Sequence, residues 1–436
     1  EINIGDWSSD VCSSDLIIYG GAHMKKHNKL SGNFIAMLIL QLSNYVFPFL
    51  TIPYLSRIFS VEHYGVILYA LAITAYLSLV CDYGFGMSAT RAVSLHRDSQ
   101  IDLARILSSV TCIKFAIFLL LLISASVCVM AMPHYRQHYL IYILTFFGLL
   151  YNVFSPTWLF QGLEQMRYIT FLNVITRGIS VAFIFTFIHH DQDYVWLPLI
   201  NLFPIILGAA YVQYILLYKL HLRYHCPSWT DIVEQLKQGW HIFLSTLIGS
   251  FYVTSNSFML GLLTHNVTYV AYYANAEKII VALNSVYSAF FSALFPHAVK
   301  LLQEDYKQGI SYIKTKLWQS TTVSLAISLV IYFLIPWFVP ILFGIKYLPT
   351  IYILRILIFV PVVICISNLL VIQTVIPLNR ERILPPLYAM SSLLYLVLVY
   401  FLVPKLAYVG MAISVLIVEL VVVTVTYIYL KKQEIF

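Results

Sequence analysis

The sequence predicts an all-α, polytopic membrane protein with about twelve transmembrane helices. Hydrophobic residues fill 60% of the 436 positions and charged residues only 10%, whereas soluble domains carry about 25% charged residues. Apolar runs of about 20 residues, the length that a helix needs to cross a bilayer, recur between short polar breaks. Lys and Arg are concentrated in alternate breaks. This composition leaves no room for a soluble catalytic domain.

The apolar runs define the expected spans in chain order. They lie near 33–55, 65–86, 107–131, 139–161, 168–188, 194–218, 241–263, 270–295, 317–343, 348–373, 384–403 and 407–430. Prolines such as Pro204 and Pro336 fall inside these runs, and membrane helices tolerate them where neighbouring groups satisfy the freed carbonyls. Because twelve is an even number, we expect both termini on the same side of the membrane.

The basic residues orient these spans. With both termini on one side, 18 of the 26 Lys and Arg residues fall in loops on that side, four on the other side and four inside spans. Positively charged loops stay in the cytoplasm, so both termini are predicted to be cytoplasmic. The net charge of +7 is explained by these loops and requires no nucleic acid partner.

Residues 1–23 are expected to be a non-native extension. They are polar and acidic and then briefly apolar, whereas a secretion signal has a basic start and about 7–15 apolar residues. The run DWSSDVCSSDL resembles translated adapter sequence. We therefore expect Met24, which precedes several lysines, to be the natural start.

The rest of the chain is expected to form two lobes and a linker. These are an N-lobe with spans one to six, a cytoplasmic amphipathic linker, and a C-lobe with spans seven to twelve, at 24–218, 219–240 and 241–436. Ser228 or Thr230 is the expected N-cap of a linker helix, because short polar side chains satisfy the first free N–H groups. The linker and the similar segment 296–316 are expected to lie on the inner leaflet as amphipathic helices.

A weak internal repeat supports the two lobes. Gly32 and Gly239 each open a span, and the segments 65–70 and 271–276 follow them at offsets of 33 and 32 residues. Six spans in each half give the halves the same orientation. Parallel repeats of this kind are typical of transporters that hold substrate between their halves.

Several segments resemble one known family. They are FPFLTIPYLSRIFSVEHYGVILYA (47–70), DYGFGMSATRAVS (82–94), PTWLFQGLEQMRYIT (156–170), GWHIFLS (239–245) and VAYYANAEKI (270–279). Their order and spacing resemble the Wzx-type O-antigen translocases, which are flippases for polysaccharide repeat units. The similarity runs from about residue 30 to the C-terminus. One departure is Ser255-Asn256-Ser257, where many relatives carry a charged residue, so a role of span seven in ion coupling stays open.

The resemblance implies a fold and an activity. The family shares the MOP superfamily with multidrug extruders and peptidoglycan-precursor flippases, which implies a MATE-like fold of two six-helix lobes around a central cavity. It implies export of an undecaprenyl-pyrophosphate-linked oligosaccharide from the inner to the outer leaflet of the bacterial inner membrane by alternating access. A polysaccharide polymerase and a chain-length regulator are further expected partners.

Cations inside the spans are the candidate substrate-binding residues. A diphosphate that crosses about 30 Å of hydrocarbon would be stabilised by fixed positive charge in a wet cavity, since phosphate pairs well with Lys and especially Arg. Charged side chains inside spans cost roughly 2.5–3.5 kcal/mol each on insertion, so they normally face protein or water. The candidate cavity cations are Arg57, Lys278, Arg177, Arg355 and Lys114.

Each cation also has a structural interpretation. Lys278 could pair with an acid on a neighbouring helix, although not with Glu277, because adjacent helix residues do not face each other. Arg57 could anchor the outer interface, and its cavity role is implied by the resemblance, because related lipid flippases carry a cavity arginine after a similar Ser-Arg pair. Arg177 needs a partner or water near the middle of span five. Arg355 and Lys114 could extend to the interface instead.

Acidic residues are candidates for ion coupling. Glu419 lies midway along span twelve and could carry a proton or serve as a structural partner of one of the cations. Glu277 is the second candidate. Asp82 ends span two beside Gly84 and Gly86 and is expected to cap the cytoplasmic loop. Inward flow of protons or sodium is the expected energy source, because the sequence has no G-x-x-x-x-G-K-[ST] loop for a nucleotide.

Other function classes fit less well. A membrane glycosyltransferase or polymerase usually has a large outer loop with acidic or arginine-rich motifs, whereas the longest outer stretch here is short and lacks paired carboxylates. A MATE-type multidrug antiporter is the main alternative, but it would need acids for cationic drugs rather than an excess of buried cations. No cofactor and no metal are expected, and the segment His189–Asp193 is interpreted as solvated polarity.

Overall fold

The computed structural model describes residues 39–435 apart from residues 41 and 45. The expected extension 1–23 and the start of the first span therefore lie outside the described residues. Within the described part, all regular structure is helical, so the all-α prediction is confirmed.

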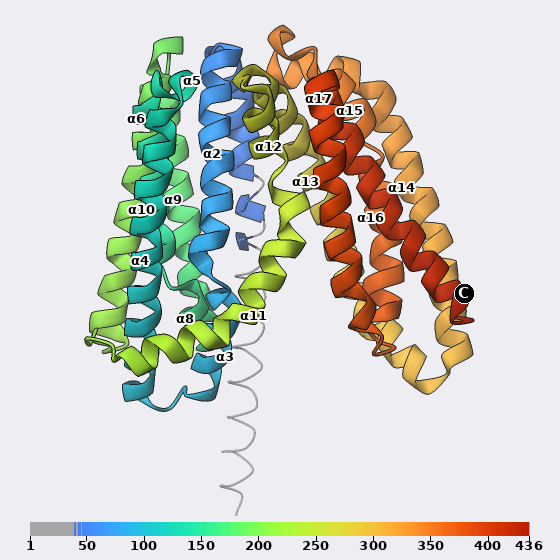
Figure 1. Ribbon diagram of the computed structural model, residues 1–436, viewed down its shortest axis with the longest axis horizontal. Helices are drawn as coiled ribbons and strands as arrows, with labels where there is room; N and C mark the ends of the chain where they lie inside the picture. Colours follow the sequence, from blue (N-terminus) through green and yellow to red (C-terminus); the bar gives the residue numbers. More distant parts are fainter. Residues whose placement is uncertain (1–38, 41, 45, 436) are drawn as a thin grey trace, which may run out of the picture.

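The helices form two bundles that stand side by side, one from each half of the chain (Figure 1). The N-terminal bundle holds a helix at 46–58, followed by α2 (Val61–Asp82), α3 (Phe85–Leu95), α4 (Gln100–Ala131), α5 (Pro133–Arg136), α6 (Tyr139–Phe147), α7 (Leu150–Phe154), α8 (Thr157–Gly162), α9 (Met166–Phe187) and α10 (Leu197–Tyr214). The C-terminal bundle holds α11 (Trp229–Thr254), α12 (Asn256–Thr264), α13 (Val267–Glu304), α14 (Tyr306–Phe343), α15 (Thr350–Leu357), α16 (Val360–Leu370) and α17 (Leu384–Lys432).

The number of spans agrees with the prediction of about twelve. In the part of the chain that the structure describes, nine helical segments are long and apolar enough to cross a membrane, and α11 with α12 forms a further span bent by 64°. α17 breaks at Ala407, where φ is 48° and ψ is −129°, and its two parts run side by side (Figure 1). They correspond to the last two predicted spans. The helix at 46–58 completes the set.

The two bundles meet along α2 and α13. A Cβ atom on Gly65 would lie 2.3 Å from the carbonyl oxygen of Val267, and one on Gly261 would lie 2.2 Å from the ring of Tyr69. Only glycine permits approach this close, which is backbone to backbone at Gly65 of α2 and backbone to tyrosine ring at Gly261 of the adjoining α12. The two segments of the predicted repeat, 65–70 and 271–276, belong to these two helices. We call this α2–α13 contact the seam.

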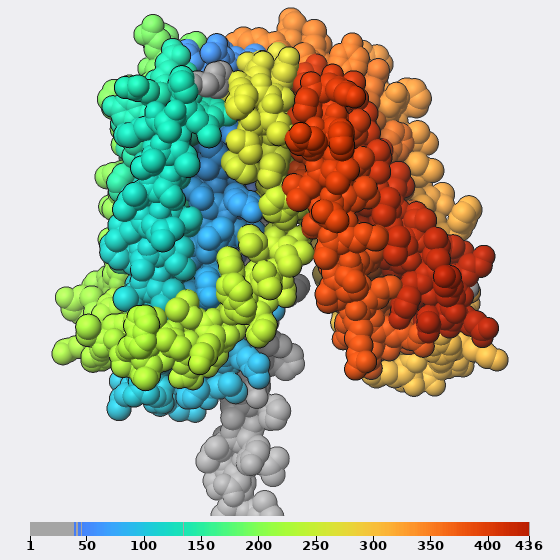
Figure 2. Space-filling model, viewed as in Figure 1, coloured from blue at the N-terminus to red at the C-terminus, as the bar shows by residue number. Residues whose placement is uncertain are grey.

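The bundles are joined at one end and diverge at the other (Figure 2). We call the end with α5 and α12 the joined end, and the end with α3, α8 and the first half of α11 the open end. The distribution of Lys and Arg predicts that the open end faces the cytoplasm.

The predicted amphipathic linker is part of a longer helix. α11 begins after Ser228, which is the N-cap as predicted and accepts a hydrogen bond from the N–H of Asp231 at 3.1 Å. The helix then continues without a break into span seven. Ile232 and Leu236 pack against a buried cluster of the N-terminal bundle, so their apolar side rests on protein rather than on the inner leaflet.

The segment 296–316 also differs from the expectation of a surface helix. It consists of the end of α13 and the start of α14, which meet at Asp305. Leu302, Ile310 and Ile313 are buried in one cluster with Leu430 of α17. The apolar side of this segment is therefore covered by the C-terminal bundle.

Candidate substrate cavity between the bundles

A cavity of about 510 Å³ lies between the two bundles. Its wall is formed by the first helix and α2 of the N-terminal bundle and by α11, α12, α13 and α14 of the C-terminal bundle. Most lining side chains are apolar, as in Phe49, Leu68, Leu71, Val281 and Phe343, and the polar ones are Asn44, Thr254, Ser257, Glu277 and Lys278. The sequence predicted a passage lined by several cations, so the cavity is more apolar and less positive than expected.

Lys278 is the predicted cation that lines this cavity. Its ammonium group lies 5.7 Å from the ring centre of Tyr64 on α2, a cation–π contact worth about 0.5–2 kcal/mol. Lys278 therefore extends from one bundle to the other across the seam. No ion pair neutralises its ammonium group among the residues that the structure describes.

Glu277 is held away from Lys278. Its two carboxylate oxygens accept hydrogen bonds from Asn256 Nδ2 at 2.9 Å and from Ser257 Oγ at 3.1 Å. Two residues of the polar run Ser255-Asn256-Ser257 thus support this acid. Because adjacent helical residues point in different directions, Lys278 keeps its charge available to a ligand.

Arg57 lies at the joined end rather than in the cavity. Its guanidinium group donates to the carbonyl oxygen of Ile341, and Lys346 donates to the carbonyl oxygens of Arg57 and Phe59, each at 3.1 Å. These bonds connect the two bundles. Lys346 lies in the short break between the predicted spans 317–343 and 348–373. The sequence did not predict this contact, because the spacing of the two residues along the chain does not indicate that they meet.

Lys114 is buried and forms an ion pair with Asp82, with 2.7 Å between Nζ and Oδ1. The other oxygen of Asp82 accepts from the N–H of Gly86 at 3.2 Å, which agrees with the predicted cap. Lys114 thus joins α4 to the end of α2, away from the residues that line the central cavity.

Arg355 and Arg177 also lie outside the wall of the cavity. The guanidinium of Arg355 stacks over the ring of Tyr332 at 5.1 Å. Arg177 is half-buried on α9. Of the five predicted cations, the structure thus brings only Lys278 to the central cavity.

The two predicted ion-coupling acids meet in a second, smaller cavity inside the C-terminal bundle. Its volume is about 80 Å³, and Glu277 and Glu419 both line it together with Asn284 and Tyr252. Glu419 is only 8% exposed. The Oδ1 atom of Asn284 is buried without a hydrogen-bond partner among the described residues. Glu277 lines both cavities, so it lies on the wall between them.

The fold and this arrangement of cavities define a polytopic membrane protein with a MATE-like fold, as expected. Solved structures with this fold include a multidrug resistance MATE family transporter in its inward-facing conformation (13% identity, 92% of this chain and 99% of that chain, TM-score 0.64). The lipid II flippase MurJ in an inward closed conformation is similarly close (13% identity, 91% and 87%, TM-score 0.64).

The chain belongs to the polysaccharide biosynthesis protein family, which matches residues 30–302. It is 26% identical over 409 residues to a protein of Escherichia coli (strain K12) named as an O-antigen transporter, covering 93% of this chain and 98% of the relative. A protein of Shigella dysenteriae with the same name is 27% identical over 391 residues, covering 90% and 97%.

Proposed function

We propose that this protein is a flippase, not an enzyme, that moves an undecaprenyl-pyrophosphate-linked oligosaccharide between the leaflets of the bacterial inner membrane. The observation that carries the proposal is Lys278, an ammonium group without an ion-pair partner among the described residues, in an apolar cavity between two bundles. The family and its O-antigen relatives supply the class of cargo. The diphosphate would contact Lys278, while the prenyl chain stays in lipid.

The shape of the molecule supports alternating access. The open end, predicted to be cytoplasmic, would admit the diphosphate and its sugars. The joined end would then have to part along the seam, breaking the bonds from Lys346 to the carbonyls of Arg57 and Phe59. The translocated unit would be passed to a polysaccharide polymerase and its chain-length regulator on the outer face.

Counter-ion flow is proposed to drive the cycle through Glu277 and Glu419. A cavity of about 80 Å³ with two carboxylates offers oxygen atoms to a sodium ion or a site for a proton. Replacing Glu419 by Gln should remove the dependence of transport on an ion gradient in vesicles. Transport that persists unchanged after both gradients are collapsed would refute ion coupling while leaving the cargo assignment intact.

The experiment that tests the cargo is reconstitution. Vesicles that contain the purified protein and a labelled lipid-linked repeat unit should expose the sugar on the opposite leaflet, and protein-free vesicles should not. In cells, deletion should leave lipid-linked units on the cytoplasmic leaflet. Vesicles that fail to move the unit but expel a cationic dye would favour the alternative, a multidrug antiporter, for which Glu277 in an apolar cavity is the supporting observation.

A further inference from the structure

A groove at the open end lies apart from both cavities. It has a volume of about 400 Å³ and separates the end of α3 from α11, with a lining that includes Ser88, Arg91, Leu95, His96, Gln238 and Ile242. Tyr64, which lies under Lys278, and Asp82 at the open end are eighteen positions apart in α2. At about 1.5 Å per residue this is about 27 Å, so the groove and Lys278 are separate sites.

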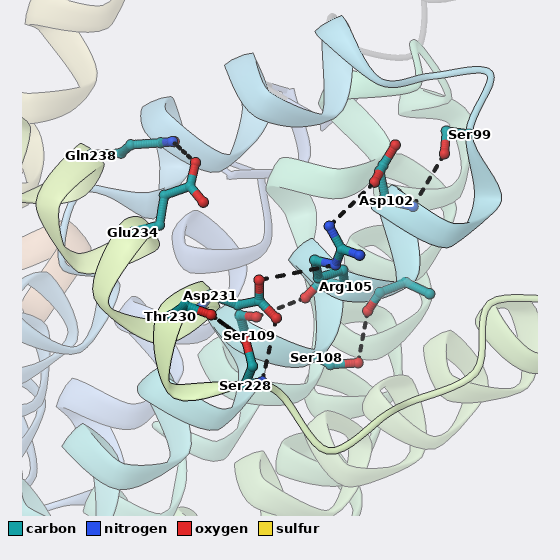
Figure 3. Close-up of polar contacts among 11 residues, drawn as sticks. Ser99, Asp102, Arg105, Ser108, Ser109, Ser228, Thr230, Asp231, Glu234 and Gln238 are labelled. Carbon is teal, nitrogen blue, oxygen red and sulfur yellow. Dashed lines mark hydrogen bonds and ion pairs between the residues drawn. The ribbon is translucent and has the colours of Figure 1, made fainter.

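The acids beside the groove are already engaged. Arg105 of α4 forms ion pairs with Asp102, with 3.7 Å between Nη1 and Oδ1, and with Asp231 of α11, with 4.0 Å between Nε and Oδ1 (Figure 3). Glu234 accepts a hydrogen bond from Gln238 at 3.1 Å and lines only a smaller neighbouring cavity of about 110 Å³. These carboxylates therefore gather on the far side of Gln238, and the lining of the groove contains no acid among the described residues.

Arg91 supplies the positive charge of the groove. Its neighbour Arg97 pairs with Glu164 at 2.7 Å, but no ion pair or hydrogen bond engages the exposed guanidinium of Arg91 within the described ranges 39–40, 42–44 and 46–435. A guanidinium group presents a planar fork of donors that matches phosphate oxygens. His96 and Gln238 could add donors from the two walls.

Large apolar side chains are exposed at the same end of the molecule, and one of them, Leu95, lines the groove. Met87, Leu95, Ile101 and Trp229 are 69%, 71%, 74% and 76% exposed. Exposed apolar and aromatic residues interleaved with arginines are typical of the membrane interface, where lipid headgroups lie. The groove is therefore placed where a headgroup could reach Arg91 while its chains remain in the bilayer.

We propose that this groove binds the phosphate of a membrane lipid, with Arg91 as the main contact. The same chemistry has two sources, an anionic phospholipid of that leaflet or the diphosphate of the cargo before it reaches Lys278. The second source rests on the proposed function, whereas the first does not. In either case the site is a contact at the open end, additional to the transport cavity.

Native mass spectrometry of the purified full-length protein tests the site. Undecaprenyl diphosphate, phosphatidylglycerol and the zwitterionic phosphatidylcholine are added in turn to the unmodified protein and to R91Q, R97Q and K278Q. R97Q is the matched control, because it removes the same charge six residues away, outside the groove. We expect R91Q to bind undecaprenyl diphosphate, phosphatidylglycerol or both about tenfold more weakly, because a charge-assisted contact with phosphate is lost. R97Q should bind like the unmodified protein.

The outcomes separate this inference from the proposed function. Equal binding by R91Q and the unmodified protein, or equal losses in R91Q and R97Q, would overturn the groove. A loss in R91Q for undecaprenyl diphosphate alone identifies the cargo as the ligand, and a loss for phosphatidylglycerol as well identifies a general anionic lipid site. Loss of undecaprenyl diphosphate in K278Q with normal binding in R91Q would overturn the groove and leave the transport cavity standing.

Discussion

At the scale of single residues, the partners of a charged side chain determine its role. Lys278 lines the central cavity without an ion-pair partner among the described residues, whereas the carboxylate of Glu277 accepts hydrogen bonds from Asn256 and Ser257. Lys114, which is more deeply buried than Lys278, forms an ion pair with Asp82. Sequence alone identified both lysines as candidates and could not separate them, since the partners come from distant parts of the chain.

Replacing Lys278 by Gln should slow transport of the lipid-linked unit about tenfold to a hundredfold, because a charge-assisted contact with phosphate contributes roughly 1.5–3 kcal/mol. K278R should retain most of the activity. The rate is measured in reconstituted vesicles, with K307Q, which removes an exposed lysine of α14, as the control for loss of charge. Normal transport by K278Q would contradict the assignment.

Replacing Lys114 by Met should act on stability instead. It leaves the half-exposed carboxylate of Asp82 without its partner, at a cost of roughly 1–3 kcal/mol. Thermal unfolding in detergent should show a lower midpoint for K114M, and the double variant K114M/D82N should recover part of the loss. An unchanged midpoint would show that the ion pair contributes nothing to the folded state.

At the scale of elements, α11 links the two bundles. Its first half is bonded to the N-terminal bundle through Asp231 and Arg105, and its second half receives a hydrogen bond from Ser392 of α17 at Ile248. Gly239 crosses the end of α2, where a Cβ atom would lie 3.0 Å from the carbonyl oxygen of Tyr83. Gly239, which opens the segment GWHIFLS, is therefore explained by the close packing of the α11 backbone against the end of α2.

Two glycines of α11 give a matched test of this crossing. G239A should lower the unfolding midpoint, because the added methyl group forces a shift that costs roughly 1–3 kcal/mol. G249A should leave the midpoint unchanged or raise it, since nothing lies within 4 Å of its Cβ position and Ala favours helix over Gly by about 1 kcal/mol. Equal effects of the two substitutions would refute the packing argument.

The helices were largely predictable because the length of an apolar run can be read directly from a local stretch of sequence. The apolar runs that predicted twelve spans also predicted the break in α17. Ala407, where the helix reverses, lies at the boundary between the predicted spans 384–403 and 407–430. The path of the chain at the open end was not predictable. Ser228 indicated the start of α11. The amphipathic pattern of Ile232 and Leu236, however, fits contact with protein as well as contact with lipid, so the pattern could not predict which of the two covers the apolar side of the helix.

At the scale of the whole molecule, hydrogen bonds connect the two bundles at the joined end. Lys346 reaches from the C-terminal bundle to the turn after the first helix. The sequence predicted two lobes and a cavity between them through the repeat and the family resemblance. It did not predict Lys346 or Tyr64, because contacts between lobes depend on how the halves dock and not on patterns within either half.

Removing the Lys346 contact should favour the state that is open at the joined end. In a variant without the native cysteines, A72C places a thiol on the wall of the central cavity. K346Q should make this thiol react severalfold faster with a membrane-impermeant maleimide added outside intact cells, because two lobe-to-lobe hydrogen bonds are lost. K307Q should leave the rate unaltered. If K346Q reacts no faster than its parent, the contact does not hold the joined end shut.

The position of Lys278 over Tyr64 has a consequence for cargo release. The ammonium belongs to one lobe and the aromatic ring to the other, so parting of the seam would expose the lysine to solvent. An attraction between opposite charges falls severalfold as more water surrounds them and raises the effective dielectric constant. Hydration of the Lys278 ammonium group would thus weaken its contact with a bound diphosphate as the outward path opens. Release of the cargo would then need no separate residue to displace it.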